Sequence, residues 1–80
     1  MQRELSPGII SDHEILGGKP TIKGHRIAVS QLLGQLAGGA TVRELQDDYQ
    51  LSDAEMRAVL LFAAQTVSEK ERELAHAERP

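Results

Sequence analysis

The spacing of apolar residues changes along the chain, from a short-strand pattern near the start to a helical pattern afterwards. Over residues 30–67 the apolar positions recur three or four residues apart, which is the period of one face of an α-helix. Gly38 and Gly39 interrupt this pattern, because glycine suits the left-handed position just beyond a helix end. The pattern therefore predicts a short helix from Ser30, a second helix over 42–49 and a longer third helix. The apolar faces consist of Leu32, Leu33, Leu36 and Ala37 in the first helix, and of Met56, Val59, Leu60, Ala63 and Val67 in the third.

Two capping signals mark the starts of the second and third helices. Thr41 is followed three residues later by Glu44, and Ser52 is followed by Glu55 at the same spacing. In this arrangement the hydroxyl oxygen accepts an amide hydrogen of the first turn, and the carboxylate accepts the amide hydrogen of the cap residue. A short linker with Leu51 in its middle joins the two helices, and Leu51 is placed to fill the corner between them. The three helices thus have the sequence outline of a helix-turn-helix unit.

The segment before the first helix is typical of short strands and turns. Thr21-Ile22 and Arg26–Val29 favour strands, and the residues between them favour a tight turn in which Gly24 takes a positive φ. Ile9-Ile10 is another β-favouring fragment. Pro20 has no amide hydrogen, so a strand that contains it should begin there or lie at a sheet edge. We therefore expect a small N-terminal β-hairpin element.

Together these elements predict one α+β domain over residues 1–80 that is mostly α. We expect a β- and turn-rich element over 1–29, a three-helix core over 30–67 and a charged helical tail over 68–80. A chain of this length buries only about 60–65% of the surface that its unfolded form exposes. It also has no cysteine, and therefore no disulfide or thiolate metal site to stabilise it. We expect it to gain burial by forming a homodimer or by binding another partner.

The charge is unevenly distributed. The net charge is −3, but residues 1–30 hold four cations against three anions, whereas residues 31–80 hold five against nine. The negative net charge argues against a protein that binds polyanions nonspecifically. A local basic patch could still bind phosphate. No stretch has the apolar length of a signal peptide core or a membrane span. We expect a cytoplasmic protein with no membrane partner.

The third helix would be the DNA reader of a helix-turn-helix unit, because its first exposed positions enter the major groove. Here these positions include Asp53 and Glu55, which phosphate repels, and Arg57 is the one cation among them. Two interpretations remain open at this point. The helices form either a simple trihelical core with a solvated acidic face or a DNA-contacting unit.

The glycine-rich ribbon of residues 17–26 is a second candidate for anion binding. It carries Lys19, Lys23 and Arg26, which become six charges in a two-fold dimer and would make DNA binding steeply salt-dependent. The alternative is that the glycines shape turns while the cations keep an exposed hairpin soluble. Both interpretations stay open on the sequence alone.

Several catalytic and metal-binding chemistries lack the residues they need. Residues 17–21 do not have the spacing of a phosphate-binding loop, and the three histidines are dispersed along the chain. Asp47 and Asp48 are adjacent on a helix and point about 100° apart, so they do not readily share a ligand or a proton. No serine has a recognisable base and orienting group. We therefore expect no enzyme, no cofactor, no metal and no small-molecule substrate.

Residues 60–64 are apolar around most of the third helix, more than one buried face requires. Leu61 and Phe62 fall outside its main apolar stripe. Either the N-terminal hairpin or another chain covers them.

On these motifs the chain resembles a bacterial and archaeal family known as domain of unknown function 433. The resemblance spans about Ile9 to Val67, and it is carried by residues 15–30, 36–39, 44–49, 51–52 and 59–64. His25 departs from the family pattern, in which we expect threonine. Members of that family look like homeodomain-type helix-turn-helix proteins, and many are regarded as VapB-type antitoxins encoded beside a PIN-like ribonuclease toxin.

The resemblance therefore implies the antitoxin of a bacterial type II toxin-antitoxin system, which covers its toxin and, as a dimer, binds operator DNA. The predicted toxin contacts are Leu61, Phe62 and Leu74. The predicted DNA contacts are Lys19, Lys23, His25, Arg26, Arg43 and Arg57. The alternative is a dimeric protein-interaction module that never touches DNA, which the acidic start of the third helix favours.

Overall fold

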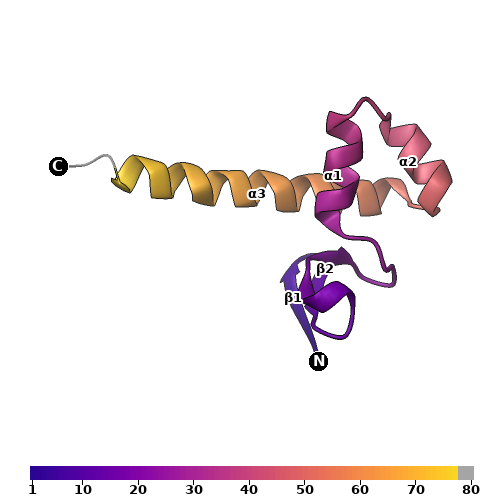
Figure 1. The fold of residues 1–80 in the computed structure, drawn as a ribbon, viewed down its shortest axis with the longest axis horizontal. Helices are drawn as coiled ribbons and strands as arrows, with labels where there is room; N and C mark the ends of the chain where they lie inside the picture. The colour runs from indigo at the N-terminus through magenta and orange to yellow at the C-terminus, as the bar shows by residue number, and fades with distance from the viewer. Residues whose placement is uncertain (78–80) are drawn as a thin grey trace.

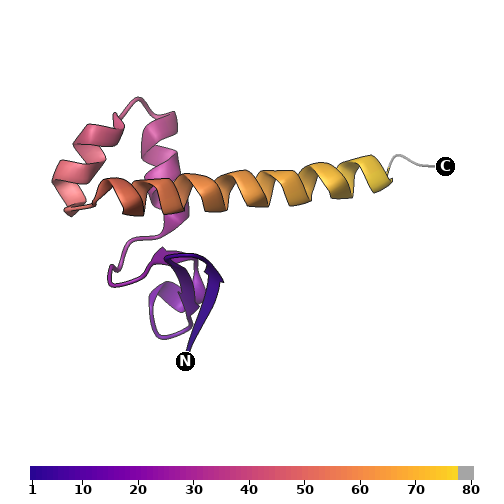
Figure 2. The same ribbon diagram turned by 180° about the vertical axis from the view of Figure 1, so that it is seen from behind.

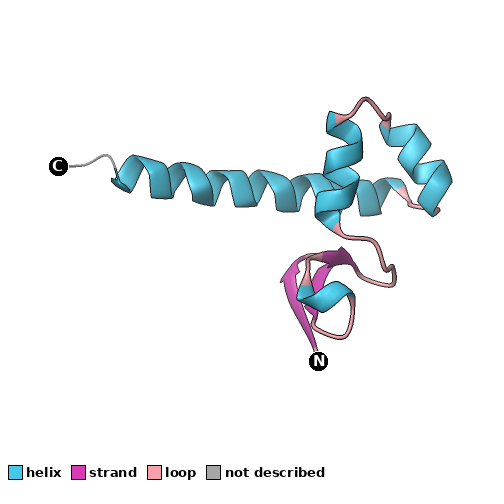
Figure 3. Ribbon diagram, viewed as in Figure 1, coloured by secondary structure: helices cyan, strands magenta, loops and turns pink. Residues whose placement is uncertain are grey.

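The computed structural model describes residues 1–77 and joins a small antiparallel sheet to three helices (Figure 1, Figure 3). The predicted mostly helical α+β fold is confirmed. Residues 78–80 of the predicted tail lie outside the described residues. The elements, in chain order, are β1 (Gln2–Ser6), β2 (Ile9–Asp12), the 3-10 turn η1 (Leu16–Gly18), β3 (Thr21–Ile22), α1 (Val29–Ala37), α2 (Val42–Tyr49) and α3 (Asp53–Ala77).

The sheet has the order β1-β2-β3, and both of its strand pairs are antiparallel. β1 and β2 form a hairpin in which Gln2 pairs with Asp12 and Ser6 pairs with Ile9. Gly8 in the connecting turn has a φ of 81°, a value that glycine adopts without steric cost. The sequence pattern missed β1 because this strand contains no β-branched residue. β1 is a strand because it pairs with the isoleucine-rich β2, although its own residues do not favour a strand.

The hairpin predicted over residues 21–29 forms in part. Thr21–Ile22 is a strand, the His25 N–H donates to the Ile22 carbonyl over 2.9 Å, and Gly24 has the expected positive φ, at 86°. The prediction of a returning strand over 26–29 is wrong, because only a single bridge joins Thr21 to Ala28. The chain leaves the sheet at this point, since Val29 already begins α1.

The helix boundaries follow the capping and glycine signals closely. Thr41 and Glu44 form the predicted capping box at the start of α2, with hydrogen bonds of 3.1 and 2.8 Å. α1 begins at Val29, one residue before the expected start, and ends directly before Gly38. The charged segment after residue 67 is helical as far as Ala77 and continues α3 without a break.

One hydrophobic core joins the sheet to all three helices. Leu51 is buried in the corner between α2 and α3, as expected. The sheet contributes side chains to the same core, so the β element and the helices form one packed body. The members of this core are Ile9, Ile22, Ile27, Val29, Leu32, Leu45, Leu51, Met56 and Val59.

The buried face of α3 is rotated from the predicted stripe. Leu60, expected in the core, is 44% exposed, whereas Phe62, expected outside the stripe, packs against the core. The sheet causes this rotation because it lies against the side of α3 that carries Ala58 and Gln65. Gly8 approaches the Ala58 side chain, and the Ser6 hydroxyl donates to the Gln65 side-chain oxygen over 3.2 Å.

The second half of α3 extends far beyond the packed body, as both views in Figures 1 and 2 show. Every residue from Ala64 to His76 is exposed. The body lies around the first part of the helix, so the described chain is elongated, with a longest dimension of 48 Å. The projecting half meets the body near its start, where Gln65 bonds to Ser6 and where Thr66 and Val67 line a groove beside α1.

Candidate functional site

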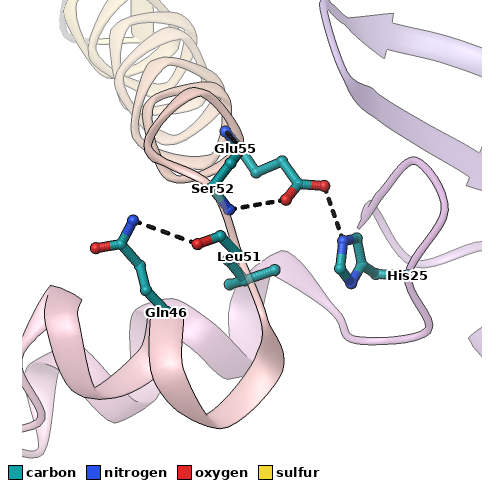
Figure 4. Close-up of polar contacts among 5 residues, drawn as sticks. All are labelled: His25, Gln46, Leu51, Ser52 and Glu55. Carbon is teal, nitrogen blue, oxygen red and sulfur yellow. Dashed lines mark hydrogen bonds and ion pairs between the residues drawn. The ribbon is translucent and has the colours of Figure 1, made fainter.

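The start of α3 is tied to the loop that precedes α1 (Figure 4). One carboxylate oxygen of Glu55 accepts the Ser52 backbone N–H over 2.9 Å, and the other lies 2.8 Å from Nε2 of His25. The Ser52 hydroxyl accepts the Glu55 N–H in return, which completes the second predicted capping box. The hydrogen bond from the Ser52 amide, assisted by the His25 contact, holds the pKa of the Glu55 carboxyl below its ordinary value.

This contact makes the first turn of α3 less open than the sequence pattern indicated. The sequence pattern placed Glu55 on an open helix face, but its carboxylate is occupied by a residue 30 positions away in the chain. Ala58, one turn further, lies against Gly8 of the β1–β2 turn. The sheet and the loop thus cover part of the face that a helix-turn-helix protein would present to DNA. No local sequence signal pairs His25 with Glu55, because only the tertiary fold brings them together.

The cations of the glycine-rich ribbon remain at the surface. Lys19, Lys23 and Arg26 are all exposed. Among residues 1–77, the described ion pairs join Met1 to Asp12, His25 to Glu55 and Lys70 to Glu73. None of them involves a ribbon lysine or Arg26.

The six predicted DNA contacts do not form one continuous patch. His25 and Arg26 line a hollow of about 270 Å³ together with Tyr49, whereas Lys23 lines another hollow beside Glu55. Arg43 lines a third hollow, which also contains Asp47 and Asp53. Arg57 lies exposed on α3. The hollow lined by His25 and Arg26 contains no carboxylate, whereas those lined by Lys23 and Arg43 do.

The predicted toxin contacts differ in accessibility. Leu61 is 48% exposed and Leu74 is 54% exposed, while Phe62 packs against the core. Phe62 also forms one wall of an almost wholly apolar groove of about 250 Å³ between α1 and α3. The groove residues are Pro20, Val29, Ser30, Leu33, Phe62, Ala63, Thr66 and Val67.

Metal binding would need a cluster of ligating side chains within residues 1–77, and a membrane span would need a long apolar helix. Nowhere in this range do three His, Cys, Asp or Glu side chains gather closely enough to hold a metal ion. None of the helices in the same range combines the length and the apolar character needed to cross a bilayer.

The fold and these surfaces define a small, mostly helical α+β domain in which a β element packs against three helices. The chain belongs to the family described as protein of unknown function (DUF433), whose profile matches residues 9–63. The resemblance stated from the sequence motifs is thereby confirmed. No curated protein and no solved structure shows significant similarity to the chain. The matched segment ends within α3, so the projecting half of that helix lies beyond it.

Proposed function

We propose that this protein is a noncatalytic, antitoxin-like binding module that covers a PIN-like ribonuclease toxin and, as a dimer, contacts operator DNA. The observation that carries the proposal is that α3 leaves apolar side chains in water on more than one side. Leu60 and Leu61 are 44% and 48% exposed and point about 100° apart, and every residue from Ala64 to His76 is exposed as well. A helix with two exposed apolar sides can pair with a second copy on one side and bind another protein on the other.

The toxin-binding part of the proposal rests on exposed apolar side chains of α3. Leu61 and Leu74 each leave about half of their surface in water. Phe62 contributes through its edge of the apolar groove between α1 and α3. Contacts of this kind, a few large apolar anchors on a helix, dominate the affinity of helix-mediated complexes.

Contact with DNA is supported by the exposed ribbon cations rather than by α3. Lys19, Lys23 and Arg26 have no ion-pair partner among residues 1–77, so phosphate would not have to displace one. The start of α3 is acidic, and Glu55 there is already bonded to His25. DNA would therefore be bound mainly through its backbone, with little reading of base sequence.

Co-purification with the PIN-like product of an adjacent gene tests the toxin part. The unsubstituted chain should form a complex and suppress ribonuclease activity, whereas Leu61→Glu should weaken the complex by at least tenfold. Val42→Glu is the matched control, because Val42 is a 40% exposed apolar residue at the start of α2, away from α3. No complex with the unsubstituted chain, or equal effects of the two variants, would contradict the proposal.

A further inference from the structure

Three exposed apolar residues form a regular stripe along α3. Leu60, Val67 and Leu74 lie seven positions apart, and they are 44%, 58% and 54% exposed. A straight α-helix drifts by about 20° per seven residues, so the three side chains lie within about 40° of one another around the helix. The stripe starts beside the packed body and runs along the projecting half.

We propose that this stripe is a self-association seam, in which α3 pairs antiparallel with α3 of a second copy about a two-fold axis at Val67. The spacing of the stripe is symmetric about its middle residue. Val67 therefore meets Val67 of the second copy, and Leu60 meets the second copy's Leu74 at both ends. An isologous two-fold interface requires self-complementarity of this kind.

The residues that flank the stripe favour this register. Ala63 and Lys70 lie on one side of the stripe, and Ala64 and Glu71 lie on the other side. In an antiparallel helix pair each side of one helix meets the same side of the other. Lys70 then lies beside Ala63 of the second copy, and Glu71 lies beside Ala64. The small alanines accommodate the longer side chains, whose methylene groups cover apolar surface while their charges reach water. No like charges meet at these positions.

A shifted antiparallel pairing of the same stripe brings like charges together. With Val67 opposite Leu74, Lys70 lies beside Lys70 and Glu71 lies beside Glu71 of the second copy. Like charges at such short distances repel, so the register centred on Val67 is the antiparallel one that the sequence of α3 favours. A parallel pair brings opposite flanks together and would set Leu60 against Leu60 and Leu74 against Leu74, which the cross-linking test below distinguishes.

Surface beside the stripe provides additional area for burial. The apolar groove between α1 and α3 is lined in part by Ala63 and Val67, so it adjoins the seam directly. The proposed pairing covers the otherwise solvated second half of α3 and leaves Leu61, about 100° away from Leu60, outside the seam. Leu74 would then belong to the self-interface, and Leu61 would remain for a different protein.

This inference deepens the proposed function, because it supplies the interface of the proposed dimer. Its test is disulfide cross-linking of the full chain, which has no native cysteine. With a mild oxidant, Val67→Cys should give a covalent dimer, whereas Leu60→Cys and Leu74→Cys should each remain largely monomeric. A mixture of the latter two variants should cross-link efficiently. Leu61→Cys is the matched control for random collision.

The mass in solution provides a second readout that needs neither toxin nor DNA. Light scattering at high micromolar concentration should show a dimer of the 8.7 kDa chain, and Val67→Glu should halve that mass. Leu61→Glu should remain dimeric, and circular dichroism should show both variants folded. A monomeric unsubstituted chain, a dimer that survives Val67→Glu, or self-linking of Leu60→Cys as strong as that of Val67→Cys would overturn the inference. A dimer with this seam that binds neither toxin nor DNA would instead reject the proposed function alone.

Discussion

Nε2 of His25 lies 2.8 Å from a carboxylate oxygen of Glu55, and this contact joins the loop before α1 to the first turn of α3. The same carboxylate also caps α3 through the Ser52 amide. Glu55 thus holds both the helix start and the loop that carries Lys23 and Arg26. This loop follows β3 of the sheet, so the contact between His25 and Glu55 links the sheet to α3. The link lies beside the exposed cations Lys23 and Arg26.

Replacing Glu55 should destabilise the fold more than replacing the equivalent glutamate of α2. Glu55→Gln should lower the free energy of unfolding by about 1 kcal/mol, because it weakens a helix cap and loses the charge beside His25. Glu44→Gln is the matched control, since Glu44 occupies the same position in the capping box of α2 but has no histidine partner. Urea unfolding followed by circular dichroism measures both values. Equal losses in the two variants would show that the His25 contact contributes nothing.

Stability should fall as the solution is acidified through the range in which Glu55 titrates. Its pKa is lowered in the folded state from an ordinary value of 4.5, so its stabilising contribution is present above that value. The contribution is lost as the pH falls through the folded-state pKa. Urea midpoints measured from about pH 7 down to about pH 3 at constant ionic strength should show this loss. Glu55→Gln should flatten the curve, and a curve unchanged by this substitution would contradict the assignment.

Two glycine substitutions should change stability in opposite directions. Gly24 has a φ of 86° with open space where a Cβ would lie, so Gly24→Ala should cost about 1 kcal/mol through backbone strain alone. Gly34 lies inside α1 with similarly open space, so Gly34→Ala should stabilise the protein by about 0.5–1 kcal/mol. Thermal unfolding of the two variants beside the unsubstituted chain tests the pair. A stabilising Gly24→Ala would mean that the turn differs from the one described.

The division of α3 into a buried and an exposed side should be evident in the cost of truncating its apolar residues. Met56 is 3% exposed, so Met56→Ala should cost about 2–5 kcal/mol by leaving a cavity in the core. Leu61→Ala should change the free energy of unfolding by less than about 0.5 kcal/mol, because the Leu61 side chain is half exposed and lies outside the core. Denaturant unfolding compares the two directly. A large loss with Leu61→Ala would place that side chain in the packed interior instead.

Removing ribbon cations should weaken DNA binding uniformly across sequences. Lys23→Ala and Arg26→Ala should each reduce the slope of affinity against salt by about 1, as expected for one lost phosphate contact. Arg72→Ala on the projecting half of α3, on the side away from the seam, is the control and should leave the slope unchanged. Fluorescence anisotropy with the upstream DNA of the protein's own gene and with an unrelated duplex measures both effects. Unchanged affinity at low salt would remove Lys23 and Arg26 from the proposed DNA interface.

Local sequence signals determined the helical part of this fold. The capping pairs Thr41/Glu44 and Ser52/Glu55 and the paired glycines after Ala37 act through hydrogen bonds and φ values within a few residues. The boundaries of α1, α2 and the start of α3 could therefore be predicted. The family could also be recognised, because its motifs are contiguous in the chain.

The tertiary structure decided what the sequence pattern could not. β1 exists because it pairs with β2, and the buried face of α3 depends on the side from which the sheet approaches it. The contact between His25 and Glu55 and the exposure of Leu60 have the same origin. Each depends on contacts between residues far apart in the chain, and the periodicity of a single helix or strand carries no information about which neighbour will cover which face.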